Sequence, residues 1–535
     1  MATIISNIEP DREHAPATAR MRTPLPGWKA ALAAFVLFVA LLVNLLLFHE
    51  YPIWTPEAGL ALLALAGVAA LYGGIYALSN WWIRALLEAL LIAAVLDSAA
   101  APVTLRIGGG IVVLAFVLWK RRSVLQFATV AALAATAAGA MGIGQQHQQA
   151  MSETVRPNNA AAPNANLPAI VHIILDEHIG IDGLPPDNPH TPAVRAALDQ
   201  FYLGHGFRVF GRAHSDYAFT GNSIPEILNF GVRPPKSKVH RRTPATIAYF
   251  DLLASKGYKL KVYQSERLNY CDVPAVVTCL TYQTQSIQGV AALPLSTETK
   301  ATIILRKLVS QTDAQVAAWA YNRLRRLGAP LPYREITDIR LNPVNSARVF
   351  DRFNADLRHA RPGEVYFAHF LLPHSPYALT SDCRVKDELW KRRQYDGPLA
   401  ARQDADFEQI LCALRKVEAA YDAVSSSPAG HNFVMIVHGD HGSRITDAEP
   451  FANRARVITD QQKIADFSAL FVARGPGLAP GYDEARLSNA AILENLARSN
   501  FTTGDAPIHP ADRNFVILAD HRNVPRVRVP LPAGW

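Results

Sequence analysis

Acidic and imidazole side chains stand directly after two apolar, β-rich segments of this sequence. Asp176 and Glu177 follow one segment, and Asp440 and His441 follow another, with a glycine on each side of that pair. Carboxylate oxygens are hard metal ligands, and an imidazole beside them suits zinc or manganese better than calcium. The pattern predicts a divalent-metal site, and the alternative is that the carboxylates only cap turns.

A third apolar segment, residues 365–372, supplies a histidine between two prolines. His374 has Pro373 before it and Pro376 two residues after it. The prolines stiffen the backbone and fix the direction of the imidazole. Such a histidine can bind a substrate oxygen or protonate a leaving group, whereas a core or surface histidine is the alternative.

Thr220 precedes a segment that has the signature of a helix start. Ser223 and Glu226 have the spacing of a capping box, and Pro225 is tolerated in a first helical turn. A helix N-terminus offers backbone N–H groups and the positive end of the helix dipole to an anion. A phosphate or sulfate bound there would meet the Thr220 hydroxyl, which metal coordination can activate as a nucleophile. The alternative is a threonine that only supports the turn.

The elements that must position these residues alternate between strand-like and helix-like patterns. Short apolar runs lie at 169–175, 207–210, 260–263, 365–372, 433–438 and 469–473. Helix-like segments between them include 191–203 and 404–424. This alternation predicts an α/β domain with a mostly parallel central sheet, in which ligands bind beyond the carboxyl ends of the strands.

The first part of the chain predicts about five membrane-spanning helices. The apolar runs lie at 30–48, 58–78, 81–101, 107–119 and 124–143. The first run is followed by further runs and lacks the cleavage pattern of a signal peptide. Lys and Arg gather before the first run and in alternate loops, at Arg84 and at Lys120 with its neighbours, which places these loops in the cytoplasm. Everything after residue 143 is then expected outside the cytoplasm.

These patterns divide the 535 residues into four parts. We expect a cytoplasmic amino terminus over 1–29, a membrane region over 30–143, a polar linker over 144–168 and a catalytic domain over 169–535. The net charge of +8 comes largely from cytoplasmic loops and scattered arginines, without the basic-aromatic pattern of nucleic-acid binding.

All four cysteines lie in the predicted catalytic domain, at Cys271, Cys279, Cys383 and Cys412. An oxidising compartment could pair them as two disulfides. Pairing each cysteine with its sequence neighbour is the simplest of three connectivities, and four free thiols are the alternative.

The four motif segments, in this order over about 169–477, resemble the alkaline phosphatase/sulfatase superfamily. The layout resembles its membrane-bound branch, which includes phosphoethanolamine transferases and lipoteichoic acid synthases. The segment 220–225 looks like the transferase pattern of a nucleophilic Thr, two residues, Ser, one residue and Pro. Asp176 matches the strand-end acidic ligand, and Asp440 with the histidine after it matches the carboxy-terminal ligand pair.

The resemblance implies a set of functional residues. The predicted ligands of one divalent metal ion are Asp176, Thr220, Asp440 and His441, with Glu177 as an optional ligand of a second ion. The predicted catalytic residues are Thr220 and His374, and the predicted substrate-binding residues are His374, Asn222 and Arg444. Zinc or manganese is expected, with calcium as a further alternative.

The resemblance also implies a reaction. A multi-pass enzyme of the bacterial inner membrane would move a phospholipid-derived headgroup to an envelope glycan or lipid, through a phospho-threonine, in a periplasmic or extracellular domain. The chain lacks the x-Pro-x-Arg sequence that a formylglycine sulfatase needs after its nucleophile, although the Asp176-Glu177 pair is closer to the sulfatase doublet. A phosphodiesterase or sulfuric ester hydrolase on the same scaffold therefore stays open. An inactive envelope-assembly scaffold is the third alternative.

Overall fold

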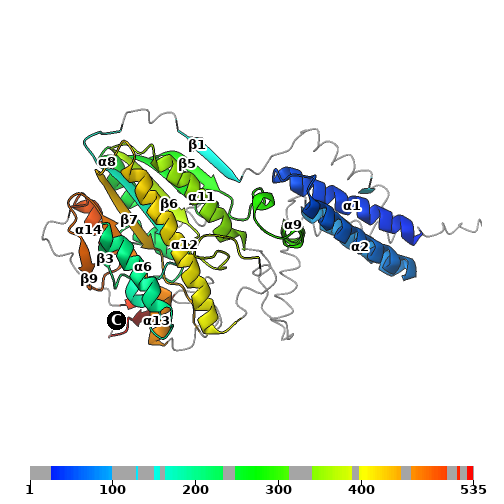
Figure 1. Cartoon of the computed structure of the whole chain (residues 1–535). Coiled ribbons are helices and arrows are strands. Elements are labelled where there is room, and N and C mark those ends of the chain that lie inside the picture. Colours follow the sequence, from blue (N-terminus) through cyan, green and yellow to red (C-terminus); the bar gives the residue numbers. More distant parts are fainter. Residues whose placement is uncertain are drawn as a thin grey trace, which may run out of the picture. The chain divides into compact units, whose positions relative to one another are not determined.

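The structure is a computed structural model (Figure 1). It divides into two compact units: one comprises residues 1–42 and 62–138, and the other comprises residues 43–61 and 139–535. The residues that it describes are 26–98, 128–129, 150–156, 163–232, 247–311, 340–387, 397–446, 459–502, 515–518, 527–533 and 535.

Three apolar helices are described in the amino-terminal part: α1 (Gly27–Phe48), α2 (Pro56–Leu78) and α3 (Trp81–Ser98). By length and composition, α1 and α2 could cross a membrane. Small residues let these two helices approach closely, because a Cβ atom on Gly73 would lie 2.4 Å from that of Ala31. The runs predicted at 107–119 and 124–143 lie outside the described residues, except for 128–129, so five spans stay a prediction.

Glu88 lies in the middle of α3 and is buried against α2. The Tyr76 hydroxyl donates a hydrogen bond of 2.8 Å to its carboxylate. With Arg84 and Asp97, it gives α3 three charged residues, one near each end and one in the middle. A buried polar pair of this kind satisfies the acidic side chain within the helices.

Nine strands of the described residues form one sheet in the order β1-β5-β4-β6-β2-β7-β8-β3-β9. Their bounds are β1 (Met151–Val155), β2 (Ala169–Leu175), β3 (Arg208–Phe210), β4 (Lys259–Ser265), β5 (Val276–Tyr282), β6 (Glu364–Phe370), β7 (Phe433–Gly439), β8 (Phe471–Arg474) and β9 (Gly481–Asp483). The central strands β5, β4, β6, β2 and β7 are mutually parallel. The predicted fold class, apolar helices followed by an α/β domain with a mostly parallel sheet, is confirmed.

The register of the central strands explains how distant motifs meet. Leu175 at the end of β2 pairs with Phe370 at the end of β6 and with Gly439 at the end of β7. Since all three strands run in the same direction, the residues that follow them emerge at one edge of the sheet. Each strand is fully buried, as expected of a parallel sheet covered on both faces.

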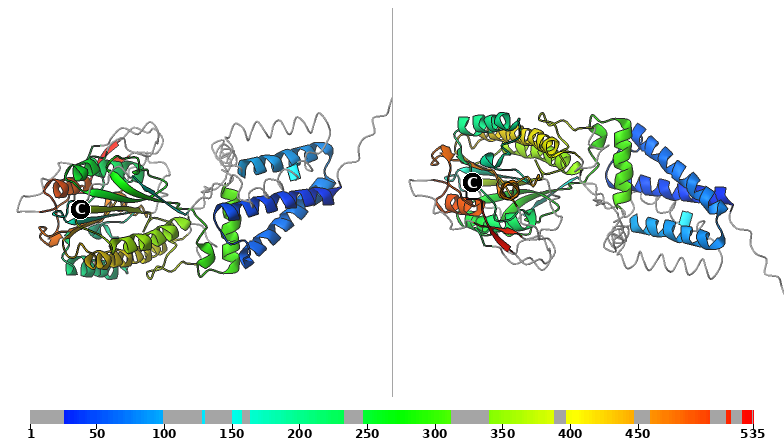
Figure 2. Two further views of the ribbon diagram at one scale, coloured as in Figure 1. Left: turned by 90° about the horizontal axis from the view of Figure 1, so that it is seen from above. Right: turned by 90° about the horizontal axis from the view of Figure 1, so that it is seen from below.

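Helices cover both faces of the sheet (Figure 2). On one face, apolar side chains of β2, β6 and β7 pack against α6 (Thr191–Gly204), α11 (Leu341–Leu357) and α12 (Leu399–Ser425). On the other face, the alternate side chains pack against α7 (Thr220–Ile227), α8 (Ala248–Ser255) and α14 (Asn489–Arg498). The remaining elements are η2 (Ile181–Gly183), η3 (Val290–Ala292), α9 (Thr297–Gln311), α13 (Asp460–Phe467), β10 (Phe515–Leu518) and β11 (Val527–Pro530).

Residues 151–155, inside the predicted linker, form the edge strand β1. All of its residues are exposed, and it pairs antiparallel with β5. A polar segment can join a sheet edge in this way because the pairing uses main-chain groups. The structured domain therefore includes residues that their composition assigned to the linker.

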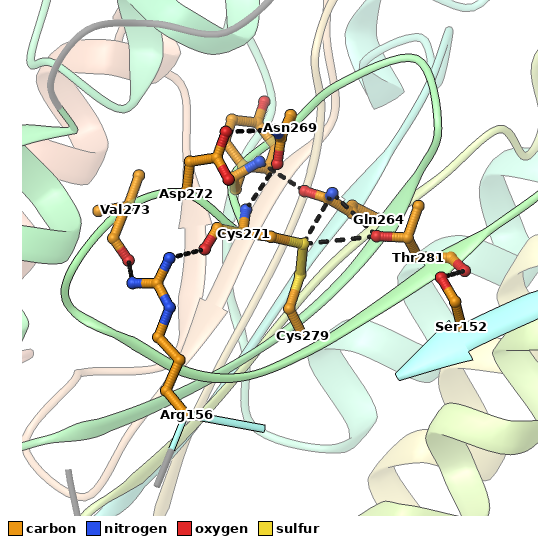
Figure 3. The surroundings of a disulfide bond; sticks show 10 residues. Ser152, Arg156, Gln264, Asn269, Cys271, Asp272, Val273, Cys279 and Thr281 are labelled. Carbon is orange, nitrogen blue, oxygen red and sulfur yellow. Dashed lines mark hydrogen bonds between the residues drawn. A yellow bond between two sulfur atoms is a disulfide. The ribbon is translucent and has the colours of Figure 1, made fainter. Parts of the chain in front are cut away.

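Both predicted disulfides are present, Cys271–Cys279 and Cys383–Cys412. The first fastens the β4–β5 connection to β5 (Figure 3). The Arg156 guanidinium, just after β1, donates hydrogen bonds of 2.6 and 2.9 Å to carbonyl oxygens of this connection. Disulfide bonds are typical of proteins in oxidising compartments.

Candidate active site

Asp440 is positioned by backbone groups at the edge of the sheet. It follows β7 directly and is completely buried. The backbone N–H groups of Glu177 and His441 donate to its Oδ1 atom at 3.0 and 2.9 Å. Gly439 lets the end of β7 lie close to the segment after β2, because a Cβ atom on Gly439 would lie 2.2 Å from the His178 carbonyl oxygen. The second carboxylate oxygen, Oδ2, faces the other site residues.

His441 directs its Nε2 atom toward the same point. Its Nδ1 lies 2.9 Å from the Gly442 carbonyl oxygen, a contact that fixes the ring when Nδ1 carries the hydrogen. The Nε2 atom lies 3.3 Å from Asp440 Oδ2 and 3.9 Å from Asp176 Oδ1. This is the orientation that a metal-ligating histidine requires.

Thr220 is the first residue of α7, and Phe219 precedes it as the N-cap without a side-chain capping bond. The Thr220 Oγ1 atom lies 3.3 Å from both carboxylate oxygens of Asp176 and 3.3 Å from His441 Nε2. The capping-box interpretation of Ser223 was wrong, because the helix begins at Thr220 itself. The Ser223 hydroxyl instead donates to Asp440 Oδ2 at 3.4 Å.

These residues form a candidate site for a divalent metal ion. One ligand atom from each of Asp176, Asp440 and His441 lies within 4.8 Å of the others, and all three side chains are buried. With the Thr220 hydroxyl they make a set of four oxygen and nitrogen donors, the number that zinc commonly takes. Two buried carboxylates this close also favour the binding of a cation, because like charges in a poorly solvated place repel strongly.

The pKa values of the two carboxyl groups diverge. Burial, and after it the negative charge of Asp176, raise the pKa of Asp440 to about 6. Burial also acts to raise the pKa of Asp176, but the histidines His374, His369 and His441 outweigh it and hold that pKa below its ordinary value. Asp176 is therefore the ionised member of the pair, and Asp440 is the member that exchanges a proton.

Metal affinity is expected to fall by at least about tenfold per pH unit below about pH 6. Below its pKa the metal-free Asp440 carries a proton that the ion must displace, whereas Asp176 stays ionised and adds no pH dependence there. Calorimetric titration of the metal-free full-length protein with zinc, between about pH 7 and pH 5, measures this. An affinity that stays constant over this range would contradict the assignment of Asp440 as a ligand.

Glu177 joins two further predicted residues. Its Oε1 atom forms an ion pair with the Arg444 guanidinium and lies 3.6 Å from His374 Nε2. Its Oε2 atom accepts a hydrogen bond of 2.8 Å from the Ser375 backbone N–H. Together with Asp176, the residues Glu177 and His374 form a second group that could hold a metal ion. The role of Glu177 as a ligand of a second ion stays a prediction. In the described structure the Glu177 carboxylate is already paired with the Arg444 guanidinium.

Arg444 reaches the site from the segment after β7. Its side chain is 10% exposed, and its guanidinium lies 5.6 Å from the centre of the Phe219 ring, next to the candidate nucleophile. Asn222 is half-buried on the first turn of α7. Substrate binding by Arg444, Asn222 and His374 remains a prediction that this placement allows.

His369 is a site residue that sequence reasoning missed. It lies within β6, is 1% exposed, and its Nε2 atom lies 3.2 Å from Asp176 Oδ2. The available signal was a histidine inside an otherwise apolar run. Burial lowers the pKa of the neighbouring His374, and the charges of Arg267 and His441 lower it further, although Asp176 opposes them.

Comparisons with known proteins give structural similarity only. No protein-family model matches the chain, and no curated protein matches it. The chain is similar to the carboxy-terminal periplasmic domain of EcEptC from Escherichia coli in complex with zinc, with 13% identity, 72% of this chain and 97% of that chain covered, and a TM-score of 0.40.

Two further solved structures are similar to this chain. For the phosphonate monoester hydrolase of Agrobacterium radiobacter the identity is 14%, the coverage is 66% of this chain and 81% of that one, and the TM-score is 0.37. For a protein in the alkaline phosphatase superfamily from Vibrio parahaemolyticus the identity is 12%, the coverage is 69% of this chain and 76% of that one, and the TM-score is 0.36. These similarities concern the fold alone, and they include a structure from the alkaline phosphatase superfamily.

Proposed function

We propose that this chain is a metal-dependent phospho-group transferase of the alkaline phosphatase/sulfatase superfamily, anchored in the bacterial inner membrane. Thr220 takes a phospho-headgroup from a phospholipid and passes it to an envelope glycan or lipid. The observation that carries the proposal is the position of the Thr220 hydroxyl, at the start of α7 and 3.3 Å from the ligand atoms of Asp176 and His441.

The start of α7 is suited to bind the phosphoryl oxygens. Asn222 and Ser223 donate their backbone N–H groups to the Phe219 carbonyl oxygen, both at 2.8 Å. Among the described residues, no such bond involves the N–H groups of Thr220 and Gly221, which are the donors left for an anion. The Arg444 guanidinium, which is paired with Glu177, also lies beside Phe219. These groups favour a phosphate ester held next to the Thr220 hydroxyl.

A bound divalent ion would supply charge neutralisation and an acidified Thr220 hydroxyl. In the first half of the reaction, the Thr220 Oγ1–phosphorus bond forms as the bond from phosphorus to the lipid oxygen breaks. The Thr220 proton, which in the resting site points to Asp176, ends on that lipid oxygen. The products of this half are a phospho-threonine and a lipid alcohol.

His374 acts in the second half of the reaction. Its lowered pKa keeps the imidazole neutral near pH 7, and its contact with the Ser375 carbonyl oxygen places the hydrogen on Nδ1. The Nε2 atom is then free to take the proton of the acceptor hydroxyl as that oxygen attacks phosphorus. The Thr220 oxygen leaves phosphorus and takes back the proton that His374 accepted. Water in place of the acceptor would make the same residues a hydrolase.

Location and metal are part of the proposal. Two helices long and apolar enough for a membrane support anchoring, and two disulfides support a domain outside the cytoplasm. We propose about five spans in all. One imidazole with two carboxylates supports zinc or manganese over calcium.

The proposal predicts a covalent adduct on Thr220. Zinc-loaded full-length protein incubated with phosphatidylethanolamine vesicles is expected to gain the mass of one phospho-headgroup, mapped to Thr220 by peptide mass spectrometry. The adduct should disappear when a lipid-linked glycan is added, and it should never form on Thr220→Ala. Free headgroup phosphate released without an acceptor would identify the hydrolase, and no adduct with no turnover would leave only the scaffold.

A further inference from the structure

A buried glutamine contacts the backbone on both sides of His374. Gln409 lies on α12, and the exposed fraction of its side chain is 0%. Its Nε2 atom donates to the carbonyl oxygens of Pro373 and His374 at 2.9 and 3.0 Å. Its Oε1 atom accepts from the Leu379 backbone N–H at 3.1 Å. Both amide hydrogens and the amide oxygen are therefore used.

We propose that Gln409 is a positioning residue that sets the direction of the His374 imidazole, which rests on the role of His374 in the proposed function. The two carbonyl groups that it binds belong to the two peptide planes that flank the His374 Cα atom. Holding both planes fixes the direction of the Cα–Cβ bond, and the side chain follows from it. The Ser375 N–H, in the second of these planes, is held by Glu177.

Helix α12 holds the whole segment that carries His374, residues 371–387. Cys412 lies one turn after Gln409 on α12 and forms the disulfide with Cys383. Glu408 on the same helix forms an ion pair with Lys386. These two contacts lie nine or more residues after His374, so within the described structure Gln409 is the α12 residue that binds the planes beside the imidazole.

The helix is a suitable support because it is long and firmly packed. It has 27 residues, and its buried side chains, among them Ile410 and Val417, lie in the main core beside β2 and β6. A site residue is placed more accurately by an element of this kind than by a loop alone. Gln409 transmits that rigidity to a segment without regular structure.

A matched control separates positioning from ordinary stabilisation. Asn345 is a buried amide on α11 whose Nδ2 atom donates to the carbonyl oxygens of Thr284 and Ser286, both at 2.9 Å. Its contacts resemble those of Gln409, but none of the residues it binds belongs to the site. Asn345→Leu and Gln409→Met both replace a buried amide by an apolar side chain of similar size.

The first experiment measures turnover of a model phosphodiester, bis(p-nitrophenyl) phosphate, by zinc-loaded full-length protein. Gln409→Met is expected to lower kcat by about 10–100-fold and to move the pH–rate profile, while Asn345→Leu does neither. In a His374→Ala background the same Gln409→Met substitution should cost little, because it acts through His374. Equal losses in both backgrounds, or an unchanged pH profile, would overturn the proposal.

The second experiment needs no turnover and so stands apart from the proposed function. Diethyl pyrocarbonate modifies accessible imidazoles, and peptide mass spectrometry reports the rate at each histidine. Gln409→Met is expected to change the rate at His374 severalfold, with other histidines unaffected and Asn345→Leu unchanged throughout. An unaltered rate at His374 in Gln409→Met would show that another contact sets its direction.

Discussion

Replacing Asp440 by asparagine is expected to remove the bound metal and to lower turnover by about a thousandfold or more, the equivalent of several kcal/mol of transition-state stabilisation. The amide oxygen of asparagine can still accept the two backbone N–H groups that Glu177 and His441 donate to Oδ1. The amide nitrogen replaces Oδ2, which faces His441 Nε2 at 3.3 Å. The substitution thus keeps the fold of the site and removes one ligand.

Metal content by inductively coupled plasma mass spectrometry, together with turnover of a phosphodiester, measures this effect. Asp406→Asn is the matched control. Asp406 is also buried, burial raises the pKa of its carboxyl group well above the ordinary value, and asparagine matches its size and shape. Full metal content and turnover in the control, with both lost in Asp440→Asn, is the expected result. Retention of metal and turnover in Asp440→Asn would contradict the metal-site assignment.

The strand-end residues of the site could be predicted because local sequence determines them. Apolar runs such as those of β2 and β7 indicate buried strands. Because the two strands run parallel, their carboxyl ends lie at one edge of the sheet. Asp176 and Asp440 then had to meet if the two strands were close. The order of strands in the sheet was not predictable, and it is the position of β6 beside β2 that brings His369 to Asp176.

Residues that act through tertiary contacts left no comparable signal. Gln409 lies 35 residues after His374 on a helix whose pattern indicates only an apolar face. The spacing of Ser223 and Glu226 matched a capping box. Because α7 begins at Thr220, Ser223 lies inside the helix, and its hydroxyl contacts Asp440 instead. Similarly, β1 has no apolar pattern because it depends on the main chain of β5. Such roles depend on the folded arrangement and not on residue spacing.

Replacing Thr220 by alanine is expected to lower turnover by at least about 10⁴-fold, because it removes the atom that bonds to phosphorus. Most of the metal should remain, since Asp176, Asp440 and His441 still supply three ligand atoms. Loss of turnover with metal retained is the combination that separates a nucleophile from a residue that only supports the site. Single-turnover kinetics with a phosphodiester, together with metal analysis, measure both.

Two further substitutions decide how the Thr220 result is interpreted. Thr220→Ser keeps a hydroxyl in the same position and is expected to retain turnover within about 100-fold of the native protein. Ser223→Ala removes the hydroxyl that contacts Asp440 Oδ2 at 3.4 Å and should cost only about tenfold, as a residue that supports a ligand. If Thr220→Ala lost no more than Ser223→Ala, Thr220 would belong with the supporting residues. Because the two hydroxyls share one helix and lie near the same carboxylates, the difference between them measures the chemistry of Thr220 itself.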